Sequence, residues 1–137
     1  MAYSFETDIL KEMSFSDLAK LSGDDQGLTI NEERIDRALE IAKNLIDATL
    51  DNIVEIDQED VPELIKDISV SLSIANLYRF QYAKSLIPNV VYKREATALD
   101  TLIKIAEGEY SLIALGSRKR ASNIIIKRFP PSKSRQK

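Results

Sequence analysis

The stretch 61-VPELIKDISVSLSIANLYRF-80 carries apolar residues on two opposite sides of one expected helix. Asp60 suits the N-cap and Pro62 the first turn, so we expect the helix to begin there. One side holds Val61, Leu64, Ile65, Ile68, Leu72 and Ala75, and the other holds Val70, Ile74 and Leu77. Such a helix is either wrapped by its own domain or shares one side with another chain. The second alternative makes the three-residue side a candidate oligomer interface.

Helical spacing continues on both sides of this stretch. Thr29 and Glu32 form a capping box, with Asn31 as an alternative cap, for a preceding helix with one apolar stripe. A further helix is expected over 91–106, and two short ones, which need packing to be stable, begin the chain. We therefore predict an all-α fold: a compact helical bundle of two short N-terminal helices and three main helices, with an extended C-terminal arm.

Charge divides the chain into a body and an arm. The net charge of −3 conceals eight basic and no acidic residues from position 118 onward. The first 117 residues keep 11 basic against all 22 acidic residues, a net charge of −11. Such asymmetry indicates an interaction tail. Since 137 residues suffice for one modest core, we expect a single helical domain over 1–116 and a basic arm over 117–137.

The arm also contains apolar residues, which are costly to expose as a group. Its segment NIIIKRF has strand-forming character and is ended by two prolines. We predict that Ile124–Phe129 docks on a neighbouring subunit or on the body, whose acidic surface receives Arg118–Arg120. The last six residues are expected to be disordered in isolation, and an arm disordered throughout is the alternative. The interface candidates here are Ile124, Ile125, Ile126 and Phe129; the candidates for contact with nucleic acid or an acidic partner are Arg118, Lys119, Arg120, Lys127, Arg128, Lys133 and Arg135.

The chain has no histidine and no cysteine, which excludes several kinds of site. Ser-His-Asp and Cys-His catalysis and nitrogen- or sulfur-ligated metal sites are impossible without them. The remaining carboxylates, lysines and hydroxyls form no catalytic motif, so we expect no enzyme and no cofactor. The loop SGDDQGLTIN can be aligned with a calcium loop through Gly27, but Ser22 then occupies the first position, where aspartate is expected. We favour an ordinary turn and predict no metal site.

No apolar run approaches the roughly 18 residues needed to span a bilayer. The N-terminus MAYSFETDIL lacks the basic start and apolar core of a signal peptide. We expect a protein that is neither secreted nor bound to a membrane.

Four segments follow one another in an order that resembles a family of phage and Mu-like prophage proteins. They are AKNLIDATL at Ala42–Leu50, DVPELIKDI at Asp60–Ile68, IANLYRF at Ile74–Phe80 and YKREATALDTLIKIAEGEYSL at Tyr92–Leu112. The family usually has an aromatic and proline-rich stretch after the first of these, where this chain has the acidic DNIVEIDQED. The path of that loop is therefore not given by the resemblance.

The resemblance implies a structural protein of the virion head or neck, similar to the small helical head–tail connector (adaptor) subunits of tailed phages. Such subunits form a ring below the portal, through which DNA passes. Partners would then be further copies of the chain, the portal and tail-completion proteins, and its place the virion, or the host bacterial cytoplasm during assembly. The alternative is a small nucleic-acid-binding module that uses the basic arm. The acidic body would repel DNA and no groove-reading motif is present, so we retain DNA contact as a secondary role.

Overall fold

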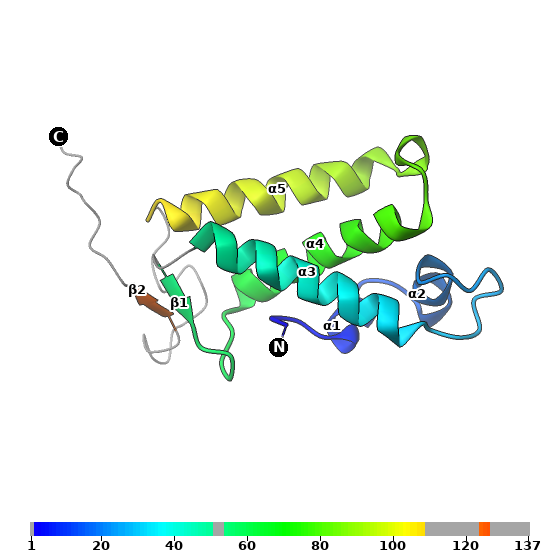
Figure 1. Ribbon diagram of the computed structural model, residues 1–137, viewed down its shortest axis with the longest axis horizontal. Coiled ribbons are helices and arrows are strands. Elements are labelled where there is room, and N and C mark those ends of the chain that lie inside the picture. Colours follow the sequence, from blue (N-terminus) through cyan, green and yellow to red (C-terminus); the bar gives the residue numbers. More distant parts are fainter. Residues whose placement is uncertain (1, 51–53, 109–123, 127–137) are drawn as a thin grey trace.

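The structure is a computed structural model, and the residues that it describes are 2–50, 54–108 and 124–126. Five α-helices account for most of these residues (Figure 1). In chain order the elements are α1 (Glu6–Leu10), α2 (Phe15–Leu21), α3 (Glu32–Leu50), β1 (Val54–Ile56), α4 (Glu63–Gln81), the 3₁₀-helix η1 (Lys84–Leu86), α5 (Asn89–Ala106) and β2 (Ile124–Ile126). The prediction of an all-α fold with two short and three main helices is confirmed. Among the described residues no helix is long and apolar enough to cross a membrane.

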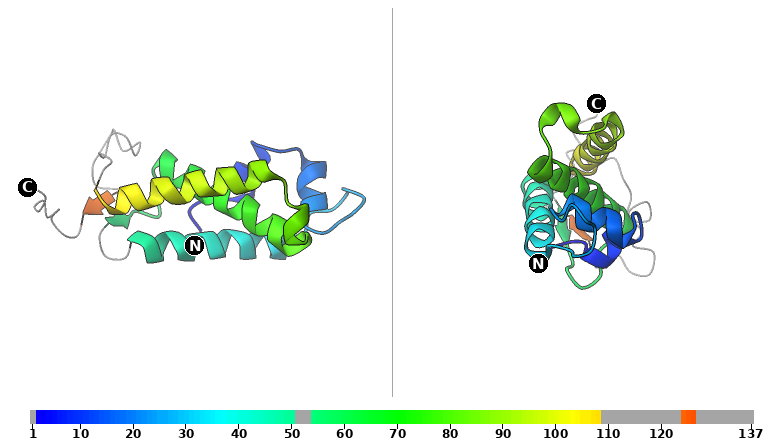
Figure 2. Two further views of the ribbon diagram at one scale, coloured as in Figure 1. Left: turned by 90° about the horizontal axis from the view of Figure 1, so that it is seen from above. Right: turned by 90° about the vertical axis from the view of Figure 1, so that its right-hand side faces the viewer.

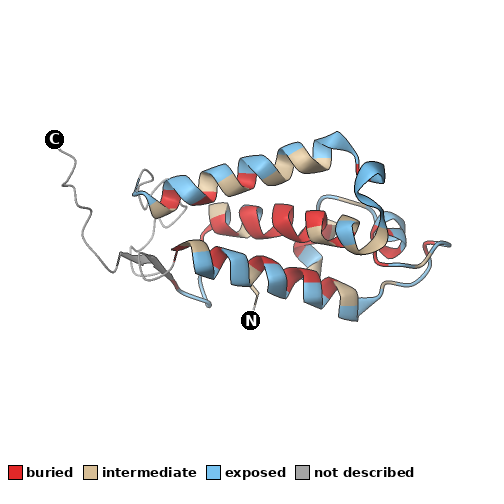
Figure 3. Ribbon diagram, turned by 45° about the horizontal axis from the view of Figure 1, so that its top comes forward, coloured by how far each residue is buried: buried red, intermediate tan, exposed pale blue. Residues whose placement is uncertain are grey.

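The helix α4 lies at the centre of the bundle. It contacts α3 and α5 along its length, while α1 and α2 pack against it as well. Figure 3 shows α4 buried over most of its turns, whereas α3 and α5 each expose an outer side. In Figures 1 and 2 the three main helices run side by side along the long axis. The β1–β2 pair lies at one end of that axis, and the turn between α4 and α5 lies at the other.

The two apolar sides of α4 fill two separate parts of the core. Ile65, Ile68 and Leu72 pack with α3, α5 and Ile56 of β1 in one cluster. The opposite side packs against α1, α2 and α3 in a second cluster, which contains Ile9, Leu18, Leu21, Ile35, Ala38, Leu39, Val70, Ile74 and Leu77. The structure thus shows a helix that is wrapped by its own chain.

This packing corrects one prediction. Val70, Ile74 and Leu77 are 3%, 5% and 0% exposed within a single chain. They are therefore covered by the N-terminal helices and do not offer a surface to a second subunit. The short helices α1 and α2, which could not be stable alone, gain their stability from this contact.

The helix ends agree with the sequence in part. Ser14 caps α2, its Oγ accepting a hydrogen bond from the backbone N–H of Asp17 at 3.1 Å, as its S-x-x-D spacing favours. At α3 the alternative cap is the one used, because Asn31 Oδ1 accepts from the N–H of Arg34 at 3.2 Å. Gly108 follows α5 with φ +80° and donates its N–H to the carbonyl of Ile105, as in a left-handed C-terminal cap.

The start of α4 differs slightly from the expected one. The helix begins at Glu63, and Pro62, with φ −59° and ψ 145°, occupies the N-cap position that Asp60 was predicted to take. Proline is compatible with that position, since it has no N–H to leave unpaired there. The first helix ends at Leu10.

The strands β1 and β2 pair in antiparallel orientation and form a two-stranded sheet. The register places Val54 opposite Ile126, Glu55 opposite Ile125 and Ile56 opposite Ile124. The strand-forming segment of the arm therefore docks, through its backbone, on the body of its own chain, one of the two predicted locations. The segment that contains β1 was expected to be an acidic loop.

Candidate assembly interface

The loop before α3 is organised by one carboxylate. Asp24 accepts hydrogen bonds from the backbone N–H groups of Gln26 (3.0 Å), Leu28 (3.0 Å) and Thr29 (2.7 Å). These bonds, with that of Gln26 first, lower the pKa of Asp24 below its ordinary value. Both oxygens of the carboxylate thus bind the loop's own backbone, which is how an aspartate closes a turn. Within the described residues no group of three or more acidic side chains is placed to hold a metal ion.

A shallow groove of about 280 Å³ lies between α4 and α5. It is lined by Leu64, Asp67, Ile68, Ser71, Arg94, Thr97, Ala98 and Thr101. The Nε of Arg94 donates to Ser71 Oγ at 2.8 Å, and the same guanidinium pairs with Glu12 at 2.5 Å. Arg94 thereby joins α5 to α4 and to the turn between α1 and α2.

Asp67 stands on the α4 side of this groove. Burial raises its pKa above the ordinary value, and the negative charges of Glu63 and Glu12 act in the same direction. Arg94 and Lys66 oppose the increase. The polar groups of the groove thus connect neighbouring elements of the body and raise the pKa of one carboxylate.

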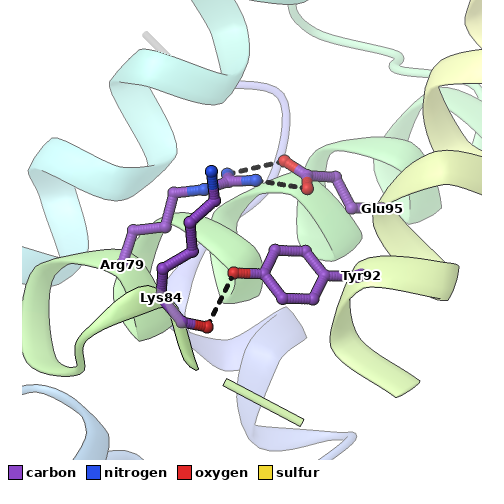
Figure 4. Close-up of polar contacts among 4 residues, drawn as sticks. All are labelled: Arg79, Lys84, Tyr92 and Glu95. Atoms are coloured by element: carbon purple, nitrogen blue, oxygen red, sulfur yellow. Dashed lines mark hydrogen bonds and ion pairs between the residues drawn. The ribbon is translucent and has the colours of Figure 1, made fainter. Parts of the chain in front are cut away.

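The corner between α4 and α5 is held by a second set of polar contacts (Figure 4). Arg79 forms a two-pronged ion pair with Glu95, in which one of the two bonds measures 2.6 Å. The hydroxyl of Tyr92 donates to the backbone carbonyl of Lys84 at 3.1 Å. The hydrogen bonds to Glu95 raise the pKa of Arg79, so its charge is firmly retained.

Apolar side chains are exposed at this corner and also on α3. Tyr82, Leu86 and Val90 are 38%, 67% and 69% exposed, and all three belong to the corner between α4 and α5. On α3, Ile41 and Leu45 stand one turn apart and are 38% and 41% exposed. Single exposed apolar residues are ordinary, but grouped ones indicate a contact surface.

Sequence analysis missed both groups. Helical spacing assigns Leu45 to the apolar stripe of α3, but the structure exposes its side chain, so that assignment is wrong. Ile41 falls outside the stripe, which is the one sign of a second surface on this helix. Leu86 and Val90 flank the break at Ile87 and Pro88, where helical periodicity carries no information.

The arm's predicted contact residues are placed only in part. Ile124, Ile125 and Ile126 form β2, described through its backbone pairing. Phe129 and the basic candidates Arg118, Lys119, Arg120, Lys127, Arg128, Lys133 and Arg135 lie outside the described residues. The proposed boundary between a body over 1–116 and an arm over 117–137 likewise falls outside them and stays a prediction.

A family model described as bacteriophage Mu, Gp36, matches residues 3–124. The chain belongs to the bacteriophage Mu Gp36 family. The Gp36 match includes all five helices and reaches the first residue of β2. The predicted resemblance to Mu-like phage proteins is therefore confirmed at the level of the family. No curated protein matches the chain.

Proposed function

We propose that the protein is a non-enzymatic virion assembly protein: a head–tail connector (adaptor) subunit that oligomerises into a ring at the head–tail junction. Membership in the bacteriophage Mu Gp36 family carries this proposal, because it identifies a phage protein with a small helical body. Its partners are further copies of itself, the portal and the tail-completion proteins. It acts in the virion, and in the host cytoplasm during assembly.

Two features of the structure support an assembly role. Ion pairs join separate elements of the body, Arg79 of α4 with Glu95 of α5 and Arg94 of α5 with Glu12 of the turn between α1 and α2. The exposed apolar groups on α3 and at the α4–α5 corner offer two separate surfaces on one body. A ring subunit needs two different surfaces, since each copy contacts one neighbour on each side through a heterologous interface.

Contact with DNA is a secondary part of the proposal. The basic residues that would make it lie in the arm, outside the described part of the chain. Eight cations would give an affinity that falls steeply with salt, whereas the body, at −11, would repel a DNA backbone.

Inactivation of the gene in the phage that encodes this chain tests the proposal. Electron microscopy of the resulting lysate should show DNA-filled heads and free tails that are not joined. Addition of the purified protein to that lysate should join them and restore infectivity. Heads that already carry tails, or a lysate without full heads, would overturn the connector role.

A purified system gives a second readout. The protein mixed with portal rings should add a layer of density below the portal in negative-stain images. The variants Leu86→Ser and Ile41→Ser should weaken this binding or the contact between copies. Glu40→Gln serves as the matched control, because Glu40 is exposed and precedes Ile41 on the same helix.

A further inference from the structure

Of the arm, the structure describes Ile124–Ile126, and these residues pair with β1 of the body. Each strand has only three residues, and the sheet they form has only two strands. So short a pair is marginal alone and needs support from the packing of one of its members. That support comes from β1, because Ile56 is 8% exposed and belongs to the core cluster beneath it.

The site that receives β2 is therefore built by the body. The backbone of β1 can form the same hydrogen bonds, in the same register, with an Ile-Ile-Ile strand of its own chain or of another copy. Exchange of an identical element between copies costs little for that reason. Addition of a strand to an exposed sheet edge is also a common way for one chain to bind another.

The length of the connection permits such an exchange. Fifteen residues, 109–123, separate Gly108 from Ile124. Covalent geometry allows them to span at most about 50 Å. A compact body of roughly 100 residues has a radius of gyration of about 13 Å. The arm is thus long enough to reach β1 of an adjacent copy.

The charge of the arm is complementary to that of the body of a second copy. The arm carries eight basic residues and no acidic ones, while the body that it would meet carries a net charge of −11. Opposite charges steer association and select this orientation of one chain toward the next.

We propose that, in the assembled ring, Ile124–Ile126 of one copy pairs with Val54–Ile56 of the next copy, in the antiparallel register of the single chain. The exchange rests on the proposed ring function and explains how the subunits are linked. The number of strand pairs is unchanged by it. Each copy then contributes its arm to one neighbour and receives the arm of the other.

Disulfide trapping tests the exchange directly, because the chain contains no cysteine. Glu55 and Ile125 are paired residues, and paired Cα atoms in antiparallel strands lie about 4.5–5.5 Å apart, within the range of a disulfide. One full-length chain carries Glu55→Cys, and a second, tagged chain carries Ile125→Cys. The two are mixed, assembled at high concentration with and without portal rings, and oxidised.

A disulfide between the two different chains is expected, well above the yield for Glu59→Cys mixed with the same partner. Glu59 is exposed and lies outside the register, so it is the matched control. The double variant should yield covalent multimers after assembly and internally linked monomers at low concentration.

Only internal disulfides in the double variant, together with no link between the single variants, would overturn the exchange. Circular dichroism checks that each variant is folded, and Val54→Cys with Ile126→Cys provides a second pair in register. The readout is independent of tail joining. Joined heads and tails with internal links alone would refute the exchange and leave the connector role intact.

Discussion

The hydroxyl oxygens of Ser4 and Ser69 lie 2.7 Å apart, although 65 residues separate them in the sequence. Both serines are fully buried, so each hydroxyl is the partner that the other needs in the core. The contact fixes the start of the chain to the middle of α4. Tyr3, which donates to Asp47 of α3, reinforces it.

Replacement of Ser69 by alanine should destabilise the protein by about 1–3 kcal/mol, because Ser4 Oγ is then buried without a partner. Ser73→Ala is the matched control on the same helix. Ser73 is equally buried, and its Oγ has no hydrogen-bond partner among the described residues, so its removal should be neutral or stabilising. Urea unfolding measures both values. An equal loss for the two variants would contradict this account.

Replacement of Gly27 by alanine should be more costly than the same change at Gly108. Both glycines have positive φ, +71° and +80°, which costs alanine about 1–2 kcal/mol. At Gly27 the added Cβ would also lie 2.5 Å from Ser16 Oγ, whereas at Gly108 it meets nothing within 4 Å. Thermal or urea unfolding of the two variants checks the order, and a larger loss at Gly108 would refute it.

Asp24 should contribute to stability at neutral pH and lose that contribution in acid. Its pKa is lowered in the folded protein, so the contribution is fully present above the ordinary value of 3.8 and disappears as the pH falls through the folded pKa. Asp24→Asn should lower the melting temperature at pH 7, and the difference from the wild type should shrink below about pH 4. Asp25→Asn removes the same charge one residue later and should leave the melting temperature nearly unchanged.

Leu77 should behave as a core residue of the single chain. It is 0% exposed between α4 and the N-terminal helices, so Leu77→Ala should cost about 2–5 kcal/mol at any protein concentration. Leu86→Ala, at a position 67% exposed, should change stability by less than about 0.5 kcal/mol. A Leu77→Ala protein that is as stable as the wild type but fails to oligomerise would restore the interface role.

The ion pair between Arg79 and Glu95 should couple α4 to α5 only weakly. The side chains are 44% and 14% exposed, so solvent and salt reduce the attraction. A double-mutant cycle with Arg79→Met and Glu95→Gln should give a coupling of about 0.5–1 kcal/mol, smaller at high salt. A coupling unaffected by salt would mean that packing, and not charge, joins these residues.

Local patterns in the sequence predicted the helices and most of their ends, because apolar periodicity and capping are local properties. They did not decide what covers Val70, Ile74 and Leu77, since burial by the same chain and by another chain require the same residues. At α3 the sequence offered Thr29 or Asn31 as the cap. The choice depends on how Asp24 folds the preceding loop, where Thr29 donates its backbone N–H to that carboxylate.

The exposed apolar groups were harder to predict. Leu86 and Val90 are exposed at the corner where Arg79 of α4 meets Glu95 of α5, and no short sequence window contains all four. The pairing of β1 with β2 was also hidden, because three residues in an acidic segment carry little strand signal by themselves. From the sequence we predicted only that the arm has strand character and that its apolar residues need a docking site.

The pairing of β1 with β2 also joins two segments that the ribosome makes at different times. Sixty-seven residues, 57–123, are translated after β1 is complete and before β2 begins. At about 5–20 residues per second this takes roughly 3–13 s. Late in that interval, once α5 has completed the core cluster around Ile56, the nascent body offers an open strand edge, while arms from finished copies already contain the strand that fits it. Chains made on one messenger are therefore well placed to meet first as neighbours.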